Sequence, residues 1–175
     1  MIAESARQNL VAASTIPDFE RRHLADSLQL LPHLRPGVLL DIGSGAGFPG
    51  MVLACCRVEP THLIEPRAKR AAFLEETARA LDLGTRVTIH AARVQRVQLP
   101  PVATITARAV ASLDVLFAMA EHLSDPETRW VLPKGRSAAQ ELEAARATWQ
   151  GEFRLTTDPE ASIVLAEGIR RRRHR

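Results

Sequence analysis

The sequence predicts an α/β fold with a mostly parallel central sheet and helices on both faces. Short apolar runs typical of buried strands alternate along the chain with longer amphipathic segments typical of helices. A glycine-rich loop directly follows the first apolar run, and no repeat or low-complexity linker interrupts the alternation. The 175 residues are enough for one domain with a substantial core. We therefore expect one principal domain over residues 37–175, preceded by an N-terminal helical extension over residues 1–36.

Within the extension, residues 18–31 predict a short amphipathic helix. Asp18 is suited to cap its start, and Pro32 would close it. The apolar side chains that recur at near-helical spacing are Phe19, Leu24, Leu28 and Leu31.

The principal domain reads as a series of strand–helix units, which favours a parallel sheet. The expected strands are residues 38–43, 61–65, 86–90, 102–108, 129–135, 153–157 and 162–169. The expected helices are residues 51–56, 68–81, 112–123 and 137–150.

Composition narrows the partners and the compartment. Five arginines crowd into residues 170–175 of a chain with a formal net charge of +3, which favours an acidic partner such as nucleic acid, although a solvated end would have the same composition. Cys55 and Cys56 are adjacent and unsuited to a mutual disulfide, and no apolar run reaches the roughly 20 residues of a membrane span. The six histidines show no metal-ligand spacing. We expect a cytoplasmic monomer that binds neither a membrane nor a metal.

The glycine loop over residues 41–50, DIGSGAGFPG, predicts a nucleotide-like ligand. Gly43, Gly45 and Gly47 let the backbone turn sharply and approach a ligand closely. Gly45, Gly47 and Gly50 also fit the dinucleotide fingerprint. The glycines alone therefore do not separate S-adenosylmethionine from NAD.

Two acids flank this loop in the chain. Asp41 would lie near a cationic cofactor but would repel a pyrophosphate, which favours S-adenosylmethionine; an acid that merely orders the loop is the alternative. Glu65 ends the next expected strand, where an acid accepts both ribose hydroxyls of either cofactor. Asp41 therefore favours a Rossmann-like class I methyltransferase, while Glu65 supports a nucleoside ligand without choosing between the two cofactors.

Five segments carry a family resemblance: HLADSL from residue 23, DIGSGAGFPG from residue 41, EPRAKRAAFL from residue 65, TARAVASL from residue 106 and VLPKG from residue 131. In this order and spacing they closely resemble the RsmG (GidB) family, the 16S ribosomal RNA (guanine-527)-N7 methyltransferases. The resemblance implies a Rossmann-like fold, S-adenosylmethionine as cofactor, and 16S rRNA in a 30S subunit or assembly intermediate as substrate.

The resemblance also implies roles for individual residues. Gly43 and Phe48 match loop positions that contact the cofactor, and Arg108 matches an arginine of the cofactor site. Val94 and Gln95 match the pair that lies along the adenine, where the family usually has glutamate in place of Gln95.

Arg108 and Lys134 follow expected parallel strands and are the candidate positioning residues. Ligands bind at this edge of open α/β sheets. Lys134 matches the lysine of a family motif and is suited to neutralise a phosphate. We expect Arg108 to contact the cofactor or a phosphate, because an arginine held on guanine O6 and N7 would block the attacking nitrogen. A solvated surface role is the alternative for both.

The expected chemistry needs no general base, because guanine N7 carries no proton. The segment after residue 105 lacks the Asn/Asp-Pro-Pro-aromatic motif of amino-group methyltransferases, and Cys55 and Cys56 are expected to be buried helix thiols rather than nucleophiles. His23 and Asp26 share a helix face that would order the cofactor-site entrance, or they are a surface pair.

Three alternative functions stay open at this point. The first is an S-adenosylmethionine-dependent methyltransferase that acts on another RNA site or on a small molecule. The second, a small NAD-dependent oxidoreductase, is disfavoured by Asp41 and by the absence of any tyrosine. The third is a non-catalytic RNA-binding relative, which Gln95 and the short N-terminal part favour.

Overall fold

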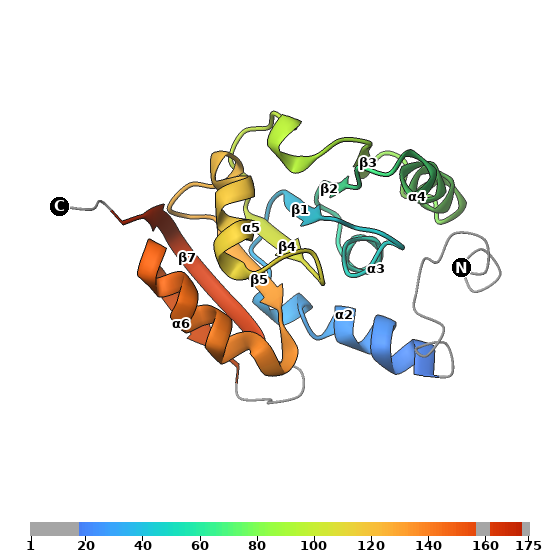
Figure 1. The fold of residues 1–175 in the computed structure, drawn as a ribbon. Coiled ribbons are helices and arrows are strands. Elements are labelled where there is room, and N and C mark those ends of the chain that lie inside the picture. Colours follow the sequence, from blue (N-terminus) through green and yellow to red (C-terminus); the bar gives the residue numbers. More distant parts are fainter. Residues whose placement is uncertain (1–17, 157–161, 173–175) are drawn as a thin grey trace.

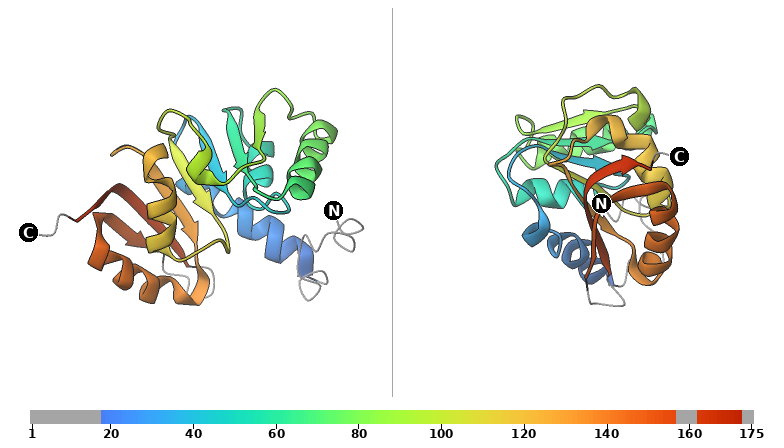
Figure 2. Two further views of the ribbon diagram at one scale, coloured as in Figure 1. Left: turned by 45° about the horizontal axis from the view of Figure 1, so that its top comes forward. Right: turned by 90° about the vertical axis from the view of Figure 1, so that its left-hand side faces the viewer.

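A single twisted sheet of seven strands organises the molecule (Figures 1 and 2). The computed structural model describes residues 18–156 and 162–172, and its strand order is β3-β2-β1-β4-β5-β7-β6. The strands β1 to β5 run parallel, while β7 pairs antiparallel with both β5 and β6. The strands are β1 Leu39–Ile42, β2 Thr61–Ile64, β3 Val87–His90, β4 Thr104–Ala107, β5 Arg129–Pro133, β6 Trp149–Leu155 and β7 Ile163–Arg171. The predicted α/β class and mostly parallel sheet are confirmed.

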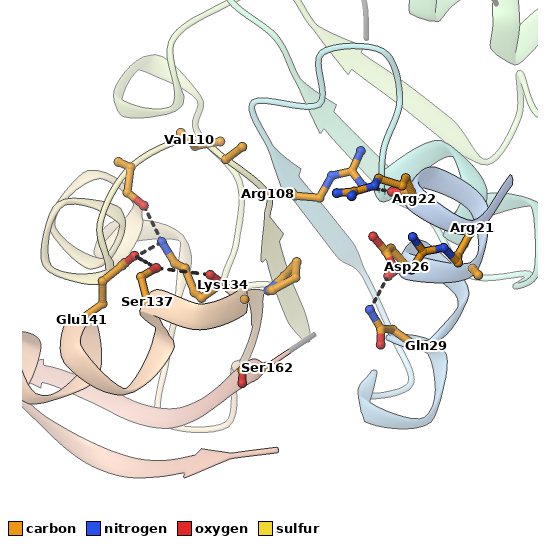
Figure 3. A pocket seen from close by; sticks show the side chains of 15 residues that line it. Arg21, Arg22, Asp26, Gln29, Arg108, Val110, Lys134, Ser137, Glu141 and Ser162 are labelled. Atoms are coloured by element: carbon orange, nitrogen blue, oxygen red, sulfur yellow. Dashed lines mark hydrogen bonds and ion pairs between the residues drawn. The ribbon is translucent and has the colours of Figure 1, made fainter. Parts of the chain in front are cut away.

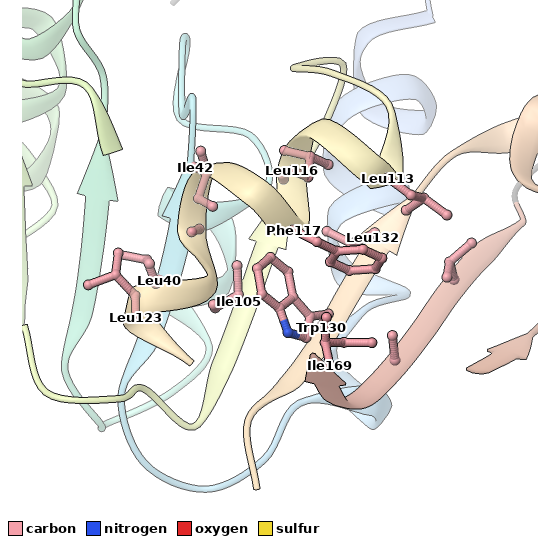
Figure 4. Close-up of a cluster of buried hydrophobic side chains, with 14 of the residues drawn as sticks. Leu40, Ile42, Ile105, Leu113, Leu116, Phe117, Leu123, Trp130, Leu132 and Ile169 are labelled. Carbon is pink, nitrogen blue, oxygen red and sulfur yellow. The ribbon is translucent and has the colours of Figure 1, made fainter. Parts of the chain in front are cut away.

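Helices cover both faces of the sheet, because the side chains of each strand alternate between two apolar cores. On one face, β1 contributes Leu40 and Ile42 to a core beneath α5 and α6, where Phe117 meets Trp130 edge to face with ring centroids 5.0 Å apart (Figure 4). On the other face, Leu39 packs beside Leu53 of α3. The helices are α3 Gly50–Cys55, α4 Ala68–Ala80, α5 Leu113–Ala120 and α6 Ala138–Thr148. Short 3-10 turns occur at η3 Leu31–His33, η4 Val94–Arg96, η5 Glu121–Leu123 and η6 Gly135–Ser137.

The N-terminal segment is not the single regular helix that the spacing predicts. It is a π-helical stretch, η2 Glu20–Ala25, followed by the short α2 Asp26–Leu28. The amide of Asp26 reaches back to the carbonyl of Arg21, and such i→i+5 bonds wind more residues into each turn. The buried face of the helix rotates as a result. Leu30 is fully buried, whereas Leu28, which the spacing predicts on the apolar face, is 41% exposed.

The last helix is shorter, and the strand after it longer, than the sequence indicates. Strand β6 begins at Trp149 rather than at Phe153. The reason is that Trp149 is fully buried in the core, where its indole Nε1 donates a hydrogen bond to the Asp114 carboxylate at 2.8 Å. This long-range packing overrides the local helical pattern.

The two cysteines are exposed, not buried as predicted. They lie at the carboxyl end of α3, whose buried positions are Gly50, Met51, Leu53 and Ala54. In the described part of the chain, no helix is long and apolar enough to cross a membrane.

Candidate active site

The glycine loop connects the end of β1 to the start of α3 and turns through left-handed backbone. Gly43, Gly45 and Gly47 have φ angles of +69°, +56° and +95°, which favour glycine over any other residue. A Cβ on Gly43 would lie 2.6 Å from Val110, whereas a Cβ on Gly45 would meet no protein atom closer than 3.7 Å. The loop therefore leaves half-buried backbone without a close side-chain contact at Gly45, which suits a ligand that approaches the main chain.

Asp41 holds this loop from below. Its side chain is fully buried and accepts hydrogen bonds from the Thr106 hydroxyl at 2.9 Å and from the Gly50 amide at 3.2 Å. Burial raises the pKa of Asp41 to about 6, although these hydrogen bonds oppose the shift. The carboxylate thus orders the loop, which is the alternative role that the sequence left open. Because the side chain is fully buried, any effect on a cationic ligand would act through its electric field rather than by contact.

Glu65 fixes the same loop from the neighbouring strand. It follows β2, is 3% exposed, and accepts hydrogen bonds from the backbone amides of Gly45 at 3.0 Å and Arg67 at 2.9 Å. Each of its carboxylate oxygens thus accepts a hydrogen bond from the chain itself. The predicted contact with ribose hydroxyls stays a prediction.

A cluster that we call the Arg108 junction joins the loop to the N-terminal helix. It consists of His23, Phe48, Arg108 and the carbonyl of Arg22. The His23 ring stacks on Phe48 with centroids 5.0 Å apart, and the Arg108 guanidinium lies 5.5 Å from the centre of the Phe48 ring. Arg108 also donates to His23 Nδ1 at 3.1 Å and to the Arg22 carbonyl at 3.2 Å.

The protonation state of His23 follows from these contacts. Burial lowers the pKa of His23 below its ordinary 6.5, and the positive charge of Arg108 lowers it further. A neutral imidazole accepts the hydrogen bond from Arg108, so the junction needs an uncharged His23.

Lys134 is paired inside the protein rather than solvated. Its side chain is 8% exposed, and its Nζ forms an ion pair with Glu141 at 2.9 Å and donates to the Ala111 carbonyl. Glu141 also accepts from the Ser137 hydroxyl at 2.8 Å and from the Leu113 amide at 3.2 Å. Burial alone would raise the pKa of Glu141, but the hydrogen bonds from Lys134 and Ser137 outweigh it and lower the pKa. Lys134 therefore ties the segment after β4 to the start of α6.

A polar pocket of about 830 Å³ lies between these two clusters (Figure 3). One wall carries Lys134 and Glu141, the opposite wall carries side chains of the N-terminal helix, and Arg108 lies between them. Ala109, in the pocket lining, has a φ of +55°, a strained conformation of the kind that gathers at functional sites. The polar side chains that line the pocket are Arg21, Arg22, Asp26, Gln29, Arg108, Lys134, Ser137, Glu141 and Ser162.

Val94 and Gln95 lie in η4, beyond the carboxyl end of β3. The Val94 side chain is buried in the core beneath α5, while Gln95 is exposed. Among the described residues, no group of three or more His, Cys, Asp or Glu side chains is arranged to hold a metal.

All the predicted site residues thus follow or end the parallel strands at one edge of the sheet. Asp41, Gly45, Gly47 and Glu65 form one network with the loop, while Phe48 and Arg108 form another with the N-terminal helix. Sequence reasoning missed the stacking of His23 on Phe48 and the Lys134–Glu141 pair. The prediction that the helix face of His23 and Asp26 orders the entrance of the cofactor site gave a signal for the first, and nothing in the sequence indicated the second.

Solved structures share this fold. A methyltransferase from Aquifex aeolicus, described as dependent on S-adenosylmethionine, aligns with a TM-score of 0.67 over 90% of this chain and 99% of that one, at 16% identity. The ribosomal protein L11 methylase of Lactobacillus delbrueckii aligns with a TM-score of 0.62 over 85% of this chain and 77% of that one, at 15% identity. At such identities the likeness concerns the fold. The fold, with its glycine loop at the carboxyl edge of the sheet, is that of a class I methyltransferase.

Sequence relatives define the group within that class. A relative from Rhizorhabdus wittichii is 46% identical over 98% of this chain and 82% of its own length, and one from Zymomonas mobilis is 44% identical over 95% and 80%. Both are named ribosomal RNA small subunit methyltransferase G. The family described as rRNA small subunit methyltransferase G matches residues 1–160. The chain belongs to this family of methyltransferases, which confirms the resemblance seen in the five sequence segments.

Proposed function

We propose that this protein transfers a methyl group from S-adenosylmethionine to N7 of guanine 527 in 16S rRNA. The observation that carries the proposal is the Arg108 junction, because it places a basic pocket directly beside the glycine loop at one edge of the sheet. Relatives at 40–46% identity are named for ribosomal RNA of the small subunit, which supports the substrate class.

The residues present fit the cofactor. The half-buried backbone at Gly45 would receive it, Glu65 would supply the acid beside the ribose, and Val94 with Gln95 would flank the adenine. Phe48 is 8% exposed beneath the Arg108 guanidinium and would form the wall of the loop nearest the pocket. When bound, S-adenosylmethionine supplies an electrophilic methyl group on a sulfonium.

The pocket beside the loop fits a guanine nucleotide in RNA. Asp26 and Gln29 offer an acid and an amide to the Watson–Crick edge of the base, and this orientation leaves N7 free. Arg21 and Arg22, which pair with the exposed Asp18 at 2.5 and 3.8 Å, line the pocket and would supply positive charge for the neighbouring phosphates. The described part of the extension, residues 18–36, would thereby complete a pocket that the rest of the described chain forms only in part.

The chain's task in this reaction is positioning. N7 has a lone pair and no proton, so its attack on the methyl group needs no general base. His23, the nearby imidazole, already accepts a hydrogen bond from Arg108. Arg108 and Lys134 would hold the two walls of the pocket so that the base meets the methyl carbon at about 3 to 3.5 Å.

The test is methyl transfer from labelled S-adenosylmethionine to 30S subunits that lack the modification, followed by mapping of the labelled base. We expect label at N7 of guanine 527. Label at another base would place the activity on a different RNA site. Cofactor binding without any labelled RNA would refute this substrate, and failure to bind the cofactor would indicate a non-catalytic RNA-binding relative.

A further inference from the structure

A second basic surface lies at the far end of β7 from the pocket. Four arginines form it, and we call it the β7 arginine patch: Arg146, Arg170, Arg171 and Arg172. The last three surround a surface hollow of about 580 Å³, together with Gln150 and Glu121. Figure 1 shows β7 running past α6 toward the C-terminal end of the chain, away from the N-terminal helix.

Three of the four arginines of the patch, all but Arg170, are held by contacts that do not cancel their charge. The Arg171 guanidinium stacks 5.0 Å from the centre of the buried Trp149 ring, and that of Arg146 lies 5.3 Å from the centre of Phe153. Arg172 donates from Nε to the carbonyls of Arg146 at 2.7 Å and Trp149 at 3.2 Å. Aromatic faces and carbonyl oxygens fix the direction of a guanidinium but leave its full positive charge.

Acidic neighbours compensate the patch only weakly. Glu121 lies 3.9 Å from Arg171, and Glu143 lies 3.6 Å from Arg146, with all four side chains well exposed. Such exposed pairs contribute little. Within the described residues Arg170 forms no ion pair. The sequence continues with Arg173 and Arg175, which add positive charge beyond the described part.

The patch and the pocket are separated by the length of one strand. Ser162 lines the pocket just before β7 begins, and Arg171 ends that strand. Nine residues of extended chain span roughly 30 Å. A partner that reaches both places must therefore present negative charge over a distance of that order, which an RNA backbone does.

We infer that the β7 arginine patch is a second contact for the phosphate backbone of ribosomal RNA, separate from the methylation pocket. This inference rests on the proposed function for the identity of the partner. Pre-oriented guanidinium groups with uncancelled charge fit phosphate oxygens, because the planar fork makes two parallel hydrogen bonds. The patch would hold the RNA but would not touch the reacting base.

The test measures binding of the full chain to 16S rRNA as a function of salt concentration. The patch variant is Arg170→Gln with Arg171→Gln. The matched control is Lys69→Gln with Arg79→Gln, which removes two exposed charges from α4. Each phosphate contact contributes about 0.7 to 0.9 to the log–log salt slope, so the patch variant should lose about 1.5 of the slope while the control keeps it.

A charge-retaining variant, Arg170→Lys with Arg171→Lys, separates phosphate binding from the packing of Arg171 on Trp149. We expect it to keep the parental slope, with unchanged calorimetric affinity for S-adenosylmethionine. On 30S subunits the glutamine variant should raise KM and leave kcat unchanged.

Equal slopes for the patch and control variants would overturn the inference. If the double variant fails to fold, Arg170→Gln alone should still reduce the slope by about 0.7 to 0.9, and an unchanged slope would overturn it as well. Failure of the proposed function is a separate result, because it is read from the parental protein as an absence of label at guanine 527.

Discussion

The glycine loop and the Arg108 junction lie at the same edge of the sheet but are built in different ways. The loop is held by strands of the domain itself: Asp41 accepts from Gly50 and from Thr106 of the neighbouring β4, and Glu65 accepts from Gly45 and Arg67. In the junction, Arg108 contacts a helix that lies 85 positions earlier in the chain. The loop therefore belongs to the folding of the domain, whereas the junction depends on how an outlying helix docks. Damage to the first should appear in stability, and damage to the second in turnover.

The strongest test of this contrast is Gly50→Ala. A Cβ at this position would lie 2.5 Å from Leu63 and 2.6 Å from two atoms of Asp41, all of them buried. We expect a loss of about 3 kcal/mol in the free energy of unfolding, at the upper end for overpacking. Urea denaturation measures it.

Gly84→Ala is the matched control, because a Cβ there meets nothing within 4 Å. Its free energy of unfolding should stay within about 0.5 kcal/mol of the parental value. Equal losses in the two variants would show that the close packing under the loop does not carry its stability.

Arg108→Ala should act in the opposite way. The variant loses the donors to His23 and Arg22 and the cation over Phe48, yet Arg108 is only half-buried and lies outside the apolar core. We expect turnover to fall about 100-fold, equivalent to about 2.7 kcal/mol, with a thermal midpoint close to the parental one. Methylation of 30S subunits and a thermal melt of the same sample measure the two quantities.

Arg79→Ala, on the exposed surface of α4, controls for the loss of one positive charge and should methylate normally. Near-normal methylation by a well-folded Arg108→Ala protein would refute the positioning role of the junction.

Asp41 sharpens the comparison through pH. Burial raises the pKa of Asp41 to about 6 from the ordinary 3.8, so its contribution to stability is complete below pH 3.8 and is lost as the pH rises through about 6. Asp41→Asn removes this titration. The difference in unfolding free energy, parental minus variant, should therefore fall by about 2 kcal/mol between pH 4 and pH 7. A difference that stays flat across this pH range would contradict the assigned burial effect.

The same contrast explains what the sequence predicts and what it does not. The strands, the loop and Asp41 are readable because their signals are local: apolar runs, positive-φ glycines and an acid at a strand end. The exposure of Leu28 and the early start of β6 at Trp149 are not readable from local signals. A π turn decides the first, and a distant hydrogen bond to Asp114 decides the second. Within the site, the Lys134–Glu141 pair joins separate segments, and no local pattern records it.

His23 gives the smallest effect and the finest test of the junction. Burial and Arg108 lower the pKa of His23, so its acceptor contact is complete above the ordinary 6.5 and is lost as the pH falls through the lowered value. The groups facing the imidazole are Arg108 from β4 and Arg22 and Asp26 from its own helix. His23→Gln keeps an acceptor that does not titrate. We expect its kcat at pH 8 to fall no more than about threefold, and its kcat to decline less toward acid pH than that of the parental protein. His23→Leu removes the acceptor, so kcat should fall about fivefold above the pKa of His23, the cost of one hydrogen bond, and should approach the parental value as the pH falls and the parental His23 becomes charged. Because burial also raises the pKa of Asp41 to about 6 and neither substitution changes Asp41, the ratio of variant to parental kcat across pH 5.5 to 8 is the quantity to measure. Identical ratios for the two variants at all pH values would show that the stacking on Phe48, rather than the hydrogen bond, is what His23 contributes to the junction.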